Sequence, residues 1–171
     1  TVAPPPATRM GKEVVGSGGT VSAALNGKQV LLGETGDAVY HITDGAAPAI
    51  LFDNAPTWVK GHDDNSNIEY ITYTHTLDGG ALTGDMRLVK QGDGVLVMPK
   101  VVNTYTGATE VWGGTLNFDG SLTGSRVWLN RFATLNSDGG KFAKGIEATY
   151  GATVRPGGKD NKGSIETDSL I

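Results

Sequence analysis

The sequence contains no cysteine, which excludes thiolate metal sites, disulfide scaffolds and cysteine nucleophiles. Basic residues are also few: 14 Lys and Arg against 18 Asp and Glu give a net charge of -4 at pH 7. Nucleic-acid binding usually requires a basic surface, so we expect no nucleic-acid partner. No apolar run reaches the length of a membrane span and no signal-peptide pattern opens the chain, so we expect no membrane partner either.

Helical periodicity is missing as well, because no window places apolar residues at i, i+3, i+4 and i+7 over several turns. Short apolar segments bounded by Gly, Asn or Asp recur instead, and Gly accounts for 26 of the 171 residues. This pattern predicts a chain that is nearly all β. The predicted strands are residues 19–25, 28–32, 38–42, 49–52, 68–77, 86–90, 94–98, 109–112, 114–118, 126–130, 133–136, 146–150, 152–155 and 164–168.

An internal repeat decides between β architectures. Thr115, Thr134 and Thr153 are separated by equal steps of 19 residues (134−115 and 153−134). The same step relates three further sets: Leu116, Leu135 and Val154; Val127, Ile146 and Ile165; Glu147 and Glu166. A repeat of this length, built from short strands and Gly-rich turns, predicts a β-solenoid, specifically a parallel β-helix with about 19–20 residues per coil.

The repeat also suggests how the chain is organised. We expect a Pro-rich linker at residues 1–10 and one β-helix domain at residues 11–171, in which residues 11–83 form irregular coils and residues 84–171 form regular ones. A separate small β domain in the first half is the alternative. The linker and the strand-like last segment suggest a piece of a larger secreted protein.

One stretch carries a specific resemblance. Residues 88–122 resemble the autotransporter-associated β-strand repeat through Leu88, Lys90, Gly92, Gly94, Leu96, Asn103, Thr104, Tyr105, Thr106, Gly107, Thr109, Gly114, Thr115 and Leu116. That resemblance implies a right-handed β-helix on a secreted or surface protein of a bacterium, and it implies no chemistry.

In size, architecture and setting the chain is also similar to carbohydrate-binding modules of family 89, parallel β-helices attached to xylanases of gut Bacteroidetes. This resemblance implies a monomeric, non-catalytic module that binds xylan or a related β-glycan. Its other partner would be the catalytic domain of the same polypeptide, a glycoside hydrolase.

Aromatic residues make up only 7% of the chain, so their positions are informative about sugar binding. The step of 19 places Trp112, Arg131 and Tyr150 at equivalent positions on successive coils, and it aligns Trp128 with Glu147 and Glu166. Alternation turns Val127 and Leu129 inward and therefore Trp128 outward. The predicted carbohydrate-binding residues are Trp112, Trp128, Asn130, Arg131, Glu147 and Tyr150. The alternative is that the aromatic side chains cap the core or shield a corner.

A cation site is a further candidate. Asp63, Asp64 and Asn65 supply the hard oxygen ligands that Ca²⁺ prefers, although such runs are also typical of turns. We expect no other cofactor.

There are three alternatives to sugar binding: an enzyme, an ice-binding protein and a structural segment. An enzyme is not expected, because adjacent Asp63 and Asp64 point apart and stacked Glu147 and Glu166 on a flat face form no cleft. The alternating segment 69–77 places Ile71, Tyr73, His75 and Leu77 on one face and a row of Thr on the other, which raises ice binding as a minor possibility. The remaining alternative is a structural stalk or passenger segment of a bacterial surface protein.

Overall fold

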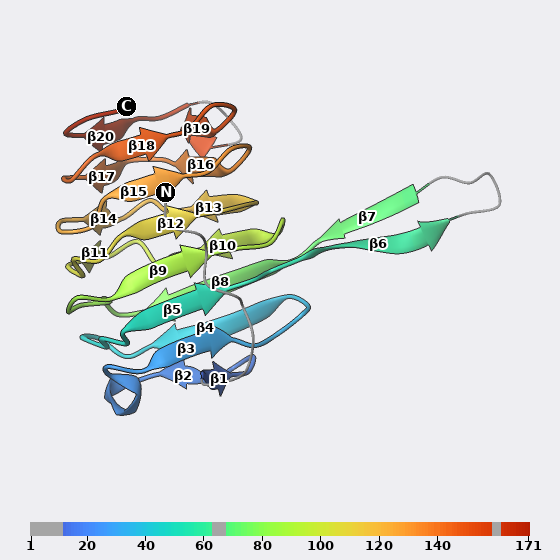
Figure 1. Ribbon diagram of the computed structural model, residues 1–171, viewed down its shortest axis with the longest axis horizontal. Helices are drawn as coiled ribbons and strands as arrows, with labels where there is room; N and C mark the ends of the chain where they lie inside the picture. The colour runs from blue at the N-terminus through green and yellow to red at the C-terminus, as the bar shows by residue number, and fades with distance from the viewer. Residues whose placement is uncertain (1–11, 63–67, 159–161) are drawn as a thin grey trace.

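The computed structural model describes residues 12–62, 68–158 and 162–171. The chain winds into a stack of parallel coils that rises from the N-terminal to the C-terminal end, which confirms the predicted parallel β-helix (Figure 1). A short 3-10 turn, η1 (Ala23–Leu25), occupies the second half of the predicted strand 19–25. None of the described segments forms a helix long and apolar enough to cross a membrane.

Three parallel sheets form the walls of the solenoid. The first sheet has seven strands: β1 (Glu13–Val15), β3 (Gln29–Leu32), β5 (Ile50–Asp53), β9 (Arg87–Lys90), β12 (Thr109–Val111), β15 (Val127–Leu129) and β18 (Ile146–Ala148). The second sheet also has seven: β2 (Thr20–Val21), β4 (Ala38–Ile42), β8 (Thr74–Gly79), β10 (Val95–Val97), β13 (Thr115–Asn117), β16 (Thr134–Ser137) and β19 (Thr153–Pro156). The third has four: β11 (Val102–Asn103), β14 (Ser121–Leu122), β17 (Gly140–Phe142) and β20 (Ile165–Thr167).

The sequence did not indicate β1, β6 or three strands of the third sheet, β11, β14 and β17, whereas β20 lies within the predicted strand 164–168. Those of the third sheet have two or three residues each and lie next to glycine-rich turns. Alternation cannot be recognised over so few residues, so sequence periodicity gives no signal there.

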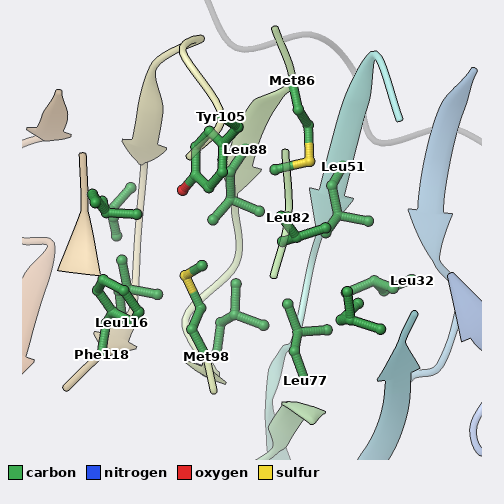
Figure 2. Close-up of a cluster of buried hydrophobic side chains, with 14 of the residues drawn as sticks. Leu32, Leu51, Leu77, Leu82, Met86, Leu88, Met98, Tyr105, Leu116 and Phe118 are labelled. Atoms are coloured by element: carbon green, nitrogen blue, oxygen red, sulfur yellow. The ribbon is translucent and has the colours of Figure 1, made fainter. Parts of the chain in front are cut away.

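Apolar side chains stack inside the coils in register. In the second sheet, Leu96, Leu116, Leu135 and Val154 occupy one column on successive strands. Figure 2 shows part of this core, in which Leu51 and Leu88 of the first sheet meet Leu77 and Leu116 of the second. The step of 19 predicted for Thr115, Thr134 and Thr153 is confirmed, because these residues are direct partners on β13, β16 and β19.

Two predicted alignments are wrong. Ile165 pairs with Gly140 and Glu166 with Lys141 in the third sheet, whereas Val127 and Trp128 pair with Ile146 and Glu147 in the first. The chain between β19 and β20 is longer than the corresponding segment of the preceding coil, so adding 19 to Glu147 reaches a different wall. Glu166 therefore lies on a different wall from Trp128.

An antiparallel hairpin interrupts the stack. Strands β6 (Thr57–His62) and β7 (Ile68–Thr72) pair with each other and project away from the coils as an arm (Figure 1). The predicted strand 68–77 is therefore two strands, one in the arm and one, β8, in the second sheet. His75 and Leu77 face the core as the alternation indicated, and Tyr73 is only half-buried at the junction.

Candidate functional site

The outer face of the first sheet carries the predicted Trp128. Val127 and Leu129 on either side of it are fully buried, so the alternation that turns Trp128 outward is confirmed. Across the ladder, Trp128 pairs with Glu110 on β12 and with Glu147 on β18. An indole ring thus lies between two carboxylate-bearing positions on neighbouring coils.

Trp112 lies beside this column rather than at the predicted position. Val111 pairs with Leu129, a step of 18, and Asn130 donates from its amide Nδ2 to the carbonyl of Trp112 at 3.3 Å. The predicted equivalence of Trp112 and Arg131 is therefore wrong by one residue. The physical reason is the corner between the first and second sheets, which contains residues 112–114 on one coil and residues 130–133 on the next.

The two indole rings contact each other. Their centroids are 4.5 Å apart and their planes are tilted by 57°. Trp112 also packs against a small apolar cluster on the outer face of the sheet, formed by Leu31, Phe52 and Val89. Trp112 therefore shields apolar surface, as the alternative interpretation stated, while Trp128 extends that surface towards the next coils.

Two ion pairs flank the indoles. Arg87 holds Glu110 with both Nε and Nη2, the second at 2.7 Å from Oε1, and the same Oε1 accepts a hydrogen bond from Nε1 of Trp112 at 3.2 Å. Glu110 raises the pKa of Arg87, mainly through this side-chain hydrogen bond. Arg126 and Glu147 are more exposed and lie 3.8 Å apart, which is a looser pair.

Together these residues line a shallow cavity of about 470 Å³, formed by Arg87, Glu110, Trp112, Arg126, Trp128 and Glu147. An apolar ring face bordered by carboxylate and guanidinium groups can pack against the C–H face of a sugar while hydrogen-bonding its hydroxyls. Arg126 and Glu147 are the groups best placed for this, because Arg87 and Glu110 already satisfy each other.

Arg131 and Tyr150 meet at the adjoining corner. The Arg131 guanidinium lies 5.9 Å from the centre of the Tyr150 ring and 4.8 Å from that of Phe132. Phe132 and Tyr150 are 69% and 86% exposed, so both rings are available to a ligand. Phe132 has φ of 66°, a strained conformation for a residue with a side chain. Sequence reasoning did not single out Phe132, since nothing in its neighbours signals this backbone conformation.

The predicted calcium ligands Asp63, Asp64 and Asn65 lie outside the described residues. Among the residues that are described, no group of three or more His, Cys, Asp or Glu side chains is arranged to hold a metal ion.

Comparison with known proteins gives one match. Residues 88–118 match the family model of the passenger-associated-transport-repeat. This segment runs from β9 through β13, and therefore includes Glu110 and Trp112. No curated protein and no solved structure matches the chain significantly. The match supports the resemblance to an autotransporter-associated repeat, whereas no relative supports a carbohydrate-binding module of family 89.

Proposed function

We propose that this chain is a β-helical passenger segment of a secreted or surface-displayed bacterial protein, in which the stack of coils acts as a rigid spacer. The observation that supports this most is the passenger-associated repeat at residues 88–118, which lies within the continuous parallel ladder from β1 to β18. In such a solenoid each coil contacts mainly its neighbours, so length follows coil number. Each coil adds about 4.8 Å.

Removal of one whole coil tests the spacer role. Deleting residues 115–133 joins Gly114 to Thr134, which is the register partner of the deleted Thr115. The shortened protein should still fold cooperatively and should reach the surface of the bacterium that secretes it, as judged by antibody labelling of intact cells. A matched deletion of residues 115–124, which breaks the register, should abolish both. Loss of folding and display in the two deletions alike would refute the spacer role.

A second function, carbohydrate binding, is favoured by the cavity around Trp112 and Trp128. Xylan or a related β-glycan is the ligand to test first, because it is the ligand that the resemblance drawn from the sequence implies. In that case the chain would dock the catalytic domain of a glycoside hydrolase on its substrate.

Affinity electrophoresis in gels that contain xylan, β-glucan, mannan or pectin distinguishes the two functions. A binding module is retarded by one of these polymers, and Trp128→Ala abolishes the retardation. Tyr70→Ala is the matched control, because Tyr70 is an exposed aromatic residue on the arm, away from the cavity. If no polymer changes the mobility of the wild-type protein, sugar binding is rejected and the spacer role is the remaining function.

A further inference from the structure

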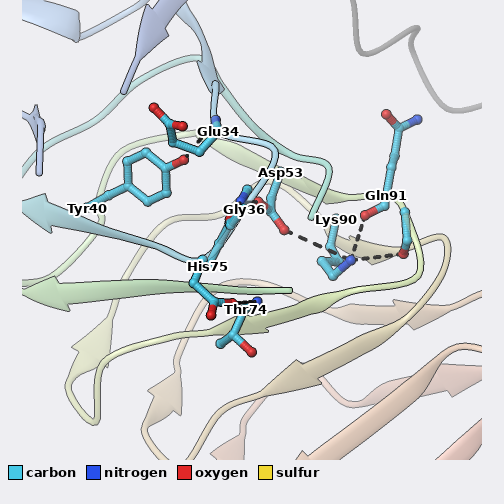
Figure 3. Close-up of polar contacts among 10 residues, drawn as sticks. Glu34, Gly36, Tyr40, Asp53, Thr74, His75, Lys90 and Gln91 are labelled. Carbon is cyan, nitrogen blue, oxygen red and sulfur yellow. Dashed lines mark hydrogen bonds and ion pairs between the residues drawn. The ribbon is translucent and has the colours of Figure 1, made fainter. Parts of the chain in front are cut away.

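Asp53, His75 and Lys90 meet inside the solenoid at the base of the arm. They come from β5, β8 and β9, and none of them has any exposed surface. Asp53 and Lys90 are register partners on adjacent parallel strands, and Lys90 Nζ lies 4.0 Å from Oδ2 of Asp53 (Figure 3). That Oδ2 is buried and has no hydrogen-bond partner.

The hydrogen bonds of Lys90 fit a neutral amine. Nζ donates to the carbonyl oxygens of Gln91 at 2.6 Å and Gly92 at 3.0 Å. An uncharged amine has two N–H donors and one lone pair, so it can make both of these bonds and keep its lone pair free to attack the carboxyl carbon of Asp53. Burial lowers the pKa of Lys90, which favours the same uncharged form.

His75 lies between Asp53 and a backbone carbonyl group. Nε2 lies 3.1 Å from the carbonyl oxygen of Gly36 and must carry a proton to donate to it. In a neutral imidazole Nδ1 then has no proton, and it can accept one from Oδ1 of Asp53, which it contacts directly. This arrangement buries three neutral groups, whereas an ionised Asp53 paired with an imidazolium or an ammonium would bury two charges without solvent.

A neutral amine held against a carboxylic acid in a dry site is a pair of reactants for amide formation. We propose that Lys90 and Asp53 condense to form an intramolecular amide bond that ties β9 to β5. A bond forms between Nζ of Lys90 and Cγ of Asp53, and the bond between Cγ and Oδ1 breaks. Oδ1 leaves as water with its own proton and one of the two Nζ protons, and the other proton stays on the amide. His75 carries the proton between these atoms and ends unchanged, and no oxidant or cofactor is consumed.

The position of the bond gives it a mechanical role. Positions 53 and 90 are 37 apart in the chain, and the segment between them contains the whole arm (90−53). A covalent link between the two register partners therefore closes the base of the arm, where the regular stack is interrupted. It also limits the freedom of the unfolded chain.

Intact-mass measurement of the denatured full chain tests the proposal. The wild-type protein should be lighter than its sequence by the mass of one water molecule, and proteolysis should release a branched peptide that contains both Asp53 and Lys90. Lys90→Met and Asp53→Ala should have the full mass. Lys100→Met is the matched control, because Lys100 is exposed, and it should still lose water.

The kinetics test the part assigned to His75. When the denatured wild-type chain is refolded and sampled over time, water loss should follow folding, and in His75→Ala it should be about a hundredfold slower. Equal rates would remove His75 from the reaction. A wild-type chain that keeps its full mass after prolonged incubation would overturn the proposal, as would water loss that persists in Lys90→Met. If a variant fails to fold, the wild-type protein alone tests the proposal: the branched peptide supports the amide bond, and its absence contradicts it.

Discussion

The side chains of Trp112 and Trp128 contact each other on adjacent coils, with ring centroids 4.5 Å apart. The two residues are not equivalent positions of the repeat, because Trp128 pairs with Glu110 and Trp112 lies next to Asn130. The contact joins the apolar cluster over β5 and β9 to the outward column that continues through Glu147. The two residues therefore have different tasks, and mutations should separate them.

Truncation of Trp112 should reduce stability more than truncation of Trp128. Trp112→Ala removes apolar packing against the cluster of Leu31, Phe52 and Val89 and a hydrogen bond to Glu110, so we expect a loss of about 2 kcal/mol in the free energy of unfolding. Trp128→Ala should cost about 1 kcal/mol, since its ring faces outward over a neighbouring strand. Urea denaturation of both variants measures the difference, and equal losses would contradict the shielding role of Trp112.

The ion pair between Arg87 and Glu110 should matter far more than that between Arg126 and Glu147. Glu110 is nearly buried, so Arg87→Ala leaves a carboxylate without its partner, and we expect a loss of about 2–3 kcal/mol. The pair of Arg126 and Glu147 is about half exposed, and Arg126→Ala should change stability by less than about 0.5 kcal/mol. Chemical denaturation at low and high salt checks both values, and a large salt-sensitive loss in Arg126→Ala would be inconsistent with this geometry.

Alkaline pH should destabilise the protein through two buried tyrosines. Burial raises the pKa of Tyr40 to about 12 and raises that of Tyr105 as well. Above pH 10 the unfolded chain loses these phenol protons while the folded chain keeps them, so stability falls as the pH rises towards 12. Where Lys90 keeps its amine, the lowered pKa of this group acts in the opposite direction, but only below its ordinary value of 10.5.

Stability should therefore be compared between pH 10.5 and pH 12. The double variant Tyr40→Phe, Tyr105→Phe should be less stable than wild type at pH 7, by about 1 kcal/mol for each lost hydrogen bond. Its stability should nevertheless decline less steeply over the alkaline range. Parallel curves for the two proteins would show that these phenols do not control alkaline unfolding.

Close approach between coils should make Gly107 sensitive to substitution. A Cβ added there would lie 2.2 Å from the carbonyl oxygen of Met86 on the preceding coil. Gly107→Ala must push the two coils apart, and we expect a loss of more than about 2 kcal/mol. Gly36→Ala is the control, because a Cβ at Gly36 meets nothing within 4 Å, and thermal unfolding should hardly change.

The coil architecture was predictable from sequence because side chains in register must have similar properties. Thr115, Thr134 and Thr153 repeat at equal intervals since each occupies the same place on the second sheet. The interval of 19 does not hold at Trp112, because its corner is one residue shorter than the corner of the next coil. The backbone conformation of Phe132 could not be predicted either, because it does not affect the apolar pattern. The arm was missed for a related reason, since its second strand and β8 read as one alternating segment.

The sequence contains a signal that could have predicted the burial of three polar residues. Asp53, His75 and Lys90 each stand two residues from a core leucine, namely Leu51, Leu77 and Leu88. Period-two alternation therefore places all three side chains inside the solenoid. What the sequence could not supply is their meeting point, which depends on pairing β5 directly with β9 across the inserted arm.

Disulfide trapping tests the parallel coil register most directly, because the chain has no cysteine of its own. Thr115→Cys combined with Thr134→Cys places two thiols on directly paired strands, within the distance that a disulfide requires. The account predicts rapid and nearly complete oxidation of this pair, and none for Thr115→Cys with Thr153→Cys, which are separated by an intervening coil. Equal oxidation of the two pairs, or preferential oxidation of the second, would contradict the stacked arrangement.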